Sequence, residues 1–294
     1  MSREENDPNP NLAVVLGAPK EDPITEIVAA YCQRRFFYYA KSVRKASELI
    51  QLLKREPDLG KRRSLVVLCS GSARYSLTQS IRRIKKQRPK AARIVIYATG
   101  LEEDGRFALD CIQAGACDYL VPGSYDVNQL QERLTLALES DTEYSPYPPF
   151  ENLRSVRRLS VFVVTPFAAL AADDYRSGIM VALKRLKIPY QRADDERLFT
   201  FLLSGICRQI DNHTVVICNI SPFGRAPNPN VFLETGYAVA TKKAVILAQR
   251  ASNRKVPSDL QGLERLEYVN CADLTLKLYF GLRALSPLAR WRRP

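Results

Sequence analysis

Short runs of apolar residues alternate along the chain with segments whose apolar positions recur at helical spacing. Five runs precede a proline-containing stretch and five follow it. They span residues 12–17, 36–40, 64–69, 93–99 and 118–121, and then 159–165, 188–192, 214–220, 244–249 and 265–269. Continuous apolar runs separated by helices are typical of parallel strands covered on both faces. The pattern therefore predicts an α/β protein with two doubly wound, parallel-sheet (flavodoxin-like) domains in tandem.

The stretch between the two sets of strands reads as a domain boundary. ESDTEYSPYPPFENLR, residues 139–154, contains three prolines and no apolar period, which is typical of a stiff linker. We expect four segments. They are a disordered N-terminus (1–10), a first domain (11–140), a proline-rich linker (141–156), and a second domain with a C-terminal helix and a basic tail (157–294).

Composition narrows the class of protein. With 294 residues, 46% hydrophobic and 26% charged, the chain reads as soluble and globular. It contains no uncharged apolar run of about 18 residues, and MSREENDPNPN at its start is unlike a signal peptide, so we expect a cytoplasmic location and no membrane contact. The seven cysteines form no CxxC pair and His213 is the only histidine. We therefore expect reduced thiols, no metal and no cofactor.

The positive charge is concentrated in the second half. The formal net charge is +13, and residues 151–294 hold 22 basic and 12 acidic residues, or +10. Such a domain attracts nucleic acid or a small anion such as a nucleotide. In SIRRIKKQRPK (80–90), however, no aromatic residues are interleaved, and Ile81 and Ile84 keep the spacing of a buried stripe, so a solvated helix face is favoured. The terminal ARWRRP leaves nucleic-acid binding open without favouring it over a disordered tail.

Polar residues follow the strands of the predicted second sheet. In open parallel sheets, ligands bind beyond the carboxyl ends of the strands. The first, second and third strands run into Thr165, Pro166 and Phe167, into Asp194 and Asp195, and into Asn219 and Ser221. This rim predicts a pocket for a polar, ring-containing ligand. Asp173 and Asp174 are expected to begin the first helix of the domain, with a position at the pocket border as the alternative.

One carboxylate is unexpectedly placed within a predicted helix. In PNPNVFLETGYAVATKK (227–243), Asn228 is a good N-cap, and the proline after it suits the first turn. At about 100° per residue, Glu234 shares a face with Asn230 and Tyr237 and with apolar neighbours. Gly236 is expected to remove bulk beside it, at a cost in helix stability. We interpret Glu234 as a nucleophile or charge stabiliser; a capping or surface acid is the alternative.

The second domain resembles a known superfamily. VFVVTPF, RADDE, TVVICNIS, NPNVFLETGYAVATKKAVILAQ and VPSDLQGLERLEY, within about residues 159–270, are similar to the nucleoside 2-deoxyribosyltransferase-like proteins, a neighbour of the Toll/interleukin-receptor-like fold. The resemblance implies that Glu234 attacks C1′ of a nucleoside sugar. With the rim residues, the predicted site has Glu234, Asp194 and Asp195 as catalytic groups. Its substrate-binding residues are Thr165, Pro166, Phe167, Asn219, Ser221, Asn228, Asn230 and Tyr237.

The sequence departs from that family at three positions. Asn219 stands where an aspartate is common, Leu233 stands where a tyrosine often precedes the glutamate, and Gln261 replaces an arginine. An amide at position 219 hydrogen-bonds a sugar or a base but cannot act as an acid.

The first domain resembles the receiver domain of two-component response regulators over about residues 11–140, chiefly through AGACDYLV and the helix after it. Receiver chemistry requires an acidic pair, a phosphoryl-accepting aspartate, a hydroxyl and a lysine. Glu21 and Asp22 come too late in the chain, and Cys69, Ala98 and Pro122 occupy the other three positions. A thiol does not replace a carboxylate as a Mg²⁺ ligand. We therefore expect a pseudoreceiver that mediates homodimerisation or docking; sensing of a small ligand is the alternative.

Three functions follow from these patterns. The leading hypothesis is an N-glycosidase or glycosyltransferase that acts on a nucleotide, nucleoside or NAD-like ligand through Glu234. The second is a non-catalytic nucleotide-binding and signalling scaffold, which Asn219 and the altered receiver positions favour. The third is nucleic-acid binding through the basic clusters.

Overall fold

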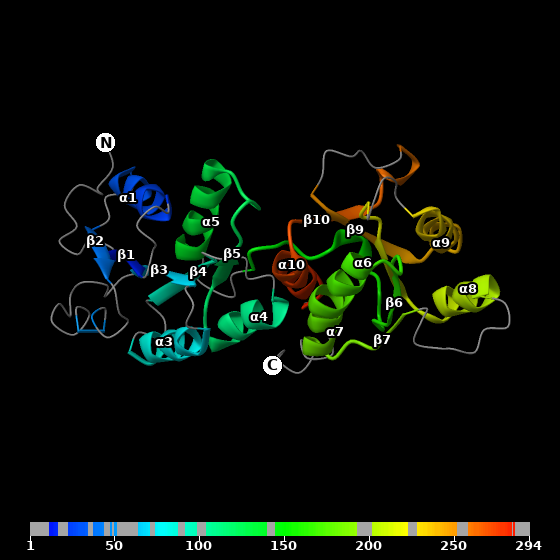
Figure 1. Ribbon diagram of the computed structural model, residues 1–294, viewed down its shortest axis with the longest axis horizontal. Helices are drawn as coiled ribbons and strands as arrows, with labels where there is room; N and C mark the ends of the chain where they lie inside the picture. Colours follow the sequence, from blue (N-terminus) through cyan, green and yellow to red (C-terminus); the bar gives the residue numbers. More distant parts are fainter. Residues whose placement is uncertain are drawn as a thin grey trace. The chain divides into compact units, whose positions relative to one another are not determined.

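The chain folds into two units, each built around a five-stranded parallel sheet (Figure 1). The structure is a computed structural model that describes residues 12–16, 23–34, 38–43, 48, 50–51, 64–70, 74–87, 92–98, 104–139, 145–192, 202–222, 228–251, 258–283 and 285. One unit comprises residues 1–102 and 107–146, and the other comprises residues 103–106 and 147–294.

The first unit has the strand order β2-β1-β3-β4-β5, with every neighbouring pair parallel. Its elements are β1 (Leu12–Leu16), α1 (Ile24–Arg34), β2 (Tyr38–Val43), β3 (Ser64–Ser70), α3 (Arg74–Gln87), β4 (Ala92–Ala98), α4 (Gly105–Ala114), β5 (Asp118–Leu120) and α5 (Val127–Glu139). Helices α1 and α5 cover one face of the sheet, and α3 and α4 cover the other (Figure 1). Ile81 and Ile84 of α3 are fully buried, which confirms the predicted stripe.

The second unit repeats the same topology. Its elements are η1 (Glu151–Leu153), β6 (Val161–Val164), α6 (Ala169–Asp173), the π-helical segment η2 (Asp174–Ile179), α7 (Met180–Arg185), β7 (Tyr190–Arg192), α8 (Leu202–Asn212), β8 (Val215–Asn219), α9 (Pro229–Ala240), β9 (Ala244–Arg250), η3 (Ser258–Leu260), β10 (Glu264–Tyr268) and α10 (Cys271–Arg283). The strand order β10-β9-β8-β6-β7 is parallel throughout and, read in chain order, is again 2-1-3-4-5. Both sheets thus have the flavodoxin-like order, and the predicted fold class is confirmed.

Two apolar clusters fill the faces of the second sheet. Val163, Ile217 and Ala248 pack beneath α6, η2, α7 and α10. The residues that alternate with them, among them Val164 and Cys218, pack beneath α8 and α9. Successive side chains of a strand point to opposite faces, so each strand end offers one residue to each helical layer. This alternation decides which side of the sheet each predicted site residue reaches.

The predicted linker contributes to the core of the second unit. Leu153 is fully buried, and the Nδ2 group of Asn152 donates to the carbonyl of Val245 at 2.8 Å. Phe150 packs on Gly281 of α10, where an added Cβ would lie 2.5 Å from the phenyl ring. The structure therefore places residues 147–156, which the sequence pattern assigns to a linker, within the second unit. None of the helices in the described parts of the chain has the length and apolar character needed to cross a membrane.

Candidate functional site

A buried carboxylate lies at the carboxyl edge of the second sheet. Asp174, the first residue of η2, has no exposed surface. Arg250, which ends β9, donates from Nη2 to Oδ1 at 2.6 Å and from Nε to both oxygens at 3.2 and 3.3 Å. The hydroxyl of Tyr268, at the end of β10, donates to Oδ2 at 2.5 Å. Because the charge of Asp174 is paired and hydrogen-bonded, its burial is tolerated.

Two of the predicted rim residues join this network. Asn219, fully buried at the end of β8, donates from Nδ2 to Oδ2 of Asp174 at 3.3 Å, and its Oδ1 accepts from the backbone N–H of Ser221 at 3.1 Å. The hydroxyl of Ser221 lies 3.0 Å from that of Tyr268 and accepts from the backbone N–H of Arg250 at 2.8 Å. Burial and the charge of Asp174 raise the pKa of Tyr268, so its hydroxyl stays protonated as a donor. The network joins the ends of three strands to η2.

The ends of β6 and β7 present a hydroxyl, a guanidinium and two aromatic rings. Thr165 is 8% exposed, and its Oγ1 makes no hydrogen bond with a described residue. Arg192 is buried, with its guanidinium 4.7 Å from the ring centre of Tyr175 and 5.5 Å from that of Phe167. Phe167 is 64% exposed, and Pro166 is buried. Thr165 follows β6, which borders β8 at the switch point where ligands of this topology bind, whereas Arg192 ends the edge strand β7.

Glu234 lies on the other face of the sheet. Burial raises the pKa of Cys207 on α8 and of Cys218 on β8, and the charge of Glu234 on α9 adds to both shifts, as the charge of Asp211 does for Cys207. The carboxyl group is half-buried and makes no hydrogen bond or ion pair within the part of the chain that the structure describes. Burial raises its pKa from 4.5 to about 7. Glu234 is thus a carboxyl group that pays a desolvation cost without a protein partner.

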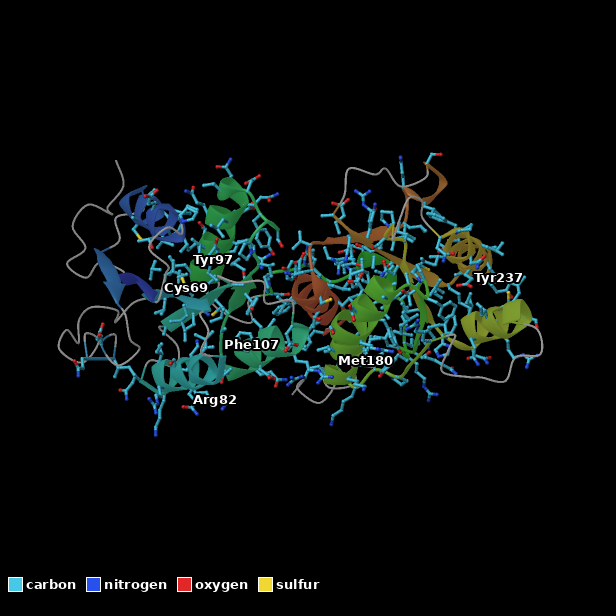
Figure 2. The ribbon with its side chains drawn as sticks, in the orientation of Figure 1. Cys69, Arg82, Tyr97, Phe107, Met180 and Tyr237 are labelled. Atoms are coloured by element: carbon cyan, nitrogen blue, oxygen red, sulfur yellow. The ribbon has the colours of Figure 1, made fainter. Side chains whose placement is uncertain are left out.

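The start of α9 forms as the sequence predicts. The side chain of Asn228 accepts from the backbone N–H of Asn230 at 2.9 Å, with Pro229 as the first helical residue. The expectation for Gly236 is wrong, because a Cβ added there would meet no described atom within 4 Å. Tyr237 points towards α8 (Figure 2), where its hydroxyl donates to Oδ2 of Asp211 at 2.9 Å.

The predicted site residues therefore fall into separate groups. Asn219 and Ser221 are hydrogen-bonded to each other beneath η2, and Glu234 lies beneath α8 and α9. Asp194 and Asp195 lie outside the described residues. Sequence reasoning missed Arg250 and Tyr268 and treated Asp174 only as a helix start or pocket border. The sequence signal that could have revealed these residues is that the fourth and fifth strands of this domain end in polar residues, Arg250 and Tyr268.

Among the described residues of the first unit, none of the strands β1, β3 and β4 ends on a carboxylate. Cys69 is 6% exposed in the core and Ser70 ends β3 opposite Ala98, the last residue of β4. Cys69 and Tyr97 lie on adjacent strands (Figure 2). Pro122 lies in the exposed turn after β5, and Glu21 and Asp22 lie outside the described residues.

Comparisons with known proteins give remote likenesses. No family model matches the chain, and no curated protein matches it. A Burkholderia pseudomallei protein named as pilus assembly-related shares 12% identity over 46% of this chain and 95% of its own, with a TM-score of 0.35. A CheY-like protein of Pseudomonas aeruginosa shares 19% over 42% and 98%, with a TM-score of 0.31. A protein named as a two-component response regulator with a GGDEF domain shares 14% over 94% and 99%, with a TM-score of 0.30.

At such scores these likenesses carry no argument about function. The strand order of the first unit, which the second unit shares, shows the flavodoxin-like fold alone. Within the described residues, no group of three or more His, Cys, Asp or Glu side chains could hold a metal ion.

Proposed function

We propose that the second unit binds a nucleotide, nucleoside or NAD-like ligand at the carboxyl edge of its sheet and cleaves its N-glycosidic bond, with Glu234 as the nucleophile. One observation carries this proposal: the carboxyl group of Glu234 is half-buried and has no protein partner among the described residues. Two fully buried carboxylates near the strand ends are both engaged: Asp174 by Arg250, Tyr268 and Asn219, and Asp273 by Lys277 and the backbone N–H of Val269. Perturbed, unpartnered carboxyl groups are enriched at active sites.

The chemistry balances without a cofactor. An oxygen of Glu234 bonds to C1′ as the bond between C1′ and the base breaks; the electron pair leaves with the base nitrogen, which takes up a proton. Water then attacks C1′, releases the sugar and regenerates the carboxylate. The exposed ring of Phe167 offers a stacking surface for a base, and the buried hydroxyl of Thr165 offers a hydrogen bond. The +10 charge of residues 151–294 favours a phosphorylated ligand.

The pairing with the first unit supports a regulated activity. Its sheet has the receiver order, whereas Cys69, Ala98 and Pro122 replace the groups that phosphoryl transfer requires. We propose that this unit acts as a non-phosphorylatable regulatory or dimerisation domain and that the protein is a homodimer through it. Sedimentation of the full chain, of residues 1–146 and of residues 147–294 tests the proposed dimer. If only the fragment 147–294 forms a dimer, the proposal is contradicted.

The alternative is a nucleotide-binding scaffold without catalysis. Asn219 favours it, because a buried amide held by Asp174 and Ser221 cannot protonate a departing base. Under this alternative the same edge binds the ligand and the N-glycosidic bond stays intact.

Base release separates the two functions. The purified protein is incubated with NAD, ribonucleotides, deoxynucleotides and nucleosides, and free base is quantified by chromatography. We expect release by the wild type and by Glu267→Gln, a control at an exposed glutamate of β10, and a loss of at least a hundredfold in Glu234→Gln. The reactive form is the carboxylate, so kcat/KM is expected to rise with pH through about 7. Binding without release of any base, unchanged in Glu234→Gln, establishes the scaffold and refutes the enzyme.

A further inference from the structure

A second polar hollow lies at the opposite end of the second sheet. It has a volume of about 640 Å³, within the range of ligand-binding cavities. Its lining residues precede β6, β8 and β9, so it opens at the amino-terminal edge, away from Glu234 and the network of Asp174. We call it the basic hollow, after Arg157, Arg158, Lys242 and Lys243 in its wall.

Charge in the basic hollow is not balanced by its surroundings. The wall contains one carboxylate, that of Asp211, and the carboxyl ends of α8 and α9 point towards it. Each helix end is equivalent to roughly −0.5 charge. The ammonium of Lys243 donates to the carbonyl of Asp211 at 2.6 Å, and the ring of His213 contacts the carbonyl of Gln209 at 2.7 Å. Both groups thus contact backbone carbonyls in the last turn of α8. Arg157 has a further interaction of its own, and the other three cations against about −2 leave an excess of roughly +1.

Two of the cations are not committed to the protein. The side chains of Arg158 and Lys242 are exposed and make no hydrogen bond or ion pair within the described residues. Lys242 has φ of 58°, the left-handed conformation that follows a helix end and favours glycine or asparagine. Lys187 adopts the same conformation after α7, with φ of 55°, so helix termination accounts for the turn itself. What distinguishes Lys242 is its place in the wall of the hollow, with an ammonium group that has no partner among the described residues.

We propose that the basic hollow binds a compact oligophosphate group, either as a free oligophosphate or as part of a nucleotide. Cations from two segments of the chain, residues 157–158 and 242–243, converge on one concave surface, which suits a small multivalent anion. The wall contains no Phe, Tyr or Trp, and its one aromatic ring, that of His213, already packs against the ring of Phe162, with 5.7 Å between the ring centres. The recognised chemistry is therefore the phosphate chain rather than the base. Because the basic hollow is separate from Glu234, the proposal of phosphate binding there does not depend on the proposed N-glycosidase activity.

Calorimetric titration with tripolyphosphate tests the proposal on the full chain. Tripolyphosphate has no sugar, so it does not report on cleavage at Glu234. We expect binding that weakens between 50 and 200 mM salt. The double variant Arg158→Gln/Lys242→Asn removes two cations, and asparagine retains the left-handed turn. A loss of about 1 kcal/mol per contact, or fivefold in Kd, predicts at least a tenfold weakening for the pair. Lys184→Gln, at an exposed lysine of α7, is the control and should stay within twofold.

Two further binding measurements, with ATP and with a single-stranded oligonucleotide, identify the source of the phosphate and test for nucleic acid. ATP bound with the same dependence on Arg158 and Lys242 indicates a nucleotide, whereas binding of tripolyphosphate alone indicates the free oligophosphate. Circular dichroism verifies that each variant is folded, and Arg158→Gln alone provides a second folded test, with about a fivefold loss. Equal affinity of wild type and double variant overturns the proposal. Binding of a single-stranded oligonucleotide without binding of tripolyphosphate also overturns it.

Discussion

The unpartnered carboxyl group of Glu234 makes the stability of the protein depend on pH. Burial raises its pKa from 4.5 to about 7 in the folded state, and the unfolded chain restores the ordinary value. The folded state therefore binds the proton more tightly. This contribution to the free energy of unfolding is fully present below about pH 4.5 and is lost as the pH rises through about 7. Glutamine resembles the protonated form and carries no charge, so Glu234→Gln should remove the dependence.

The magnitude follows from the two pKa values. At 1.36 kcal/mol per pH unit, the interval from 4.5 to about 7 corresponds to about 3 kcal/mol. The carboxyl group is partly exposed, and water screens its charge, so we reduce the expected effect to about 1–2 kcal/mol. Glu234→Gln should thus leave stability nearly unchanged at pH 5 and raise the free energy of unfolding by about 1–2 kcal/mol at pH 8.

Urea unfolding of the full chain, followed by circular dichroism at pH 5 and pH 8, measures this difference. Glu267→Gln controls for the loss of a glutamate, since Glu267 is exposed in an ion pair with Arg265, and such pairs contribute little. A stabilisation by Glu234→Gln that is equal at both pH values would contradict the raised pKa. A wild type more stable than the variant at pH 8 would show instead that Glu234 has a partner that holds its charged form.

Two other predictions concern packing and the buried network. Asp174→Ala leaves the guanidinium of Arg250 without its carboxylate, and we expect the free energy of unfolding to fall by about 3 kcal/mol. This value is at the low end for buried ion pairs because the side chain of Arg250 is 29% exposed. A loss below about 1 kcal/mol would mean that water replaces the carboxylate. Gly281→Ala drives a methyl group into the ring of Phe150 and should cost about 1–3 kcal/mol in the same urea unfolding assay, whereas Gly236→Ala, in open space on α9, should stabilise by about 0.5–1 kcal/mol. Equal effects of the two substitutions would contradict the packing at α10.

Much of the fold could be predicted because apolar periodicity is a local property of the sequence. Each of the ten apolar runs contains or overlaps an observed strand, and Ile81 and Ile84 are buried as their spacing indicates. The start of α9 at Asn228 and Pro229 was also readable, since N-cap chemistry involves only neighbouring residues. The burial of Phe150 and Leu153 was not, because the contact of Phe150 with Gly281 joins segments far apart in the chain.

The candidate site was only partly predictable for the same reason. The sequence indicated that Asn219 and Ser221 lie at a strand end and that Glu234 sits in an unusual helical position. It did not show that Asn219 contacts Asp174, because 45 residues separate them. Nor did it show that Asn219 faces η2 whereas its neighbour Cys218 faces α8 and α9, which is the side on which Glu234 lies.

The sequence by itself determined two doubly wound α/β units, the residues Cys69, Ala98 and Pro122 at the strand ends of the first, and a glutamate among apolar neighbours in the second. These depend on residue identity and on local period, and both are written in the chain. Only the tertiary structure decided that Asp174 is fully paired and that Glu234 has no partner among the described residues. Burial and pairing depend on which strand ends and helices meet, and that is set by packing across the whole unit rather than by any segment of it.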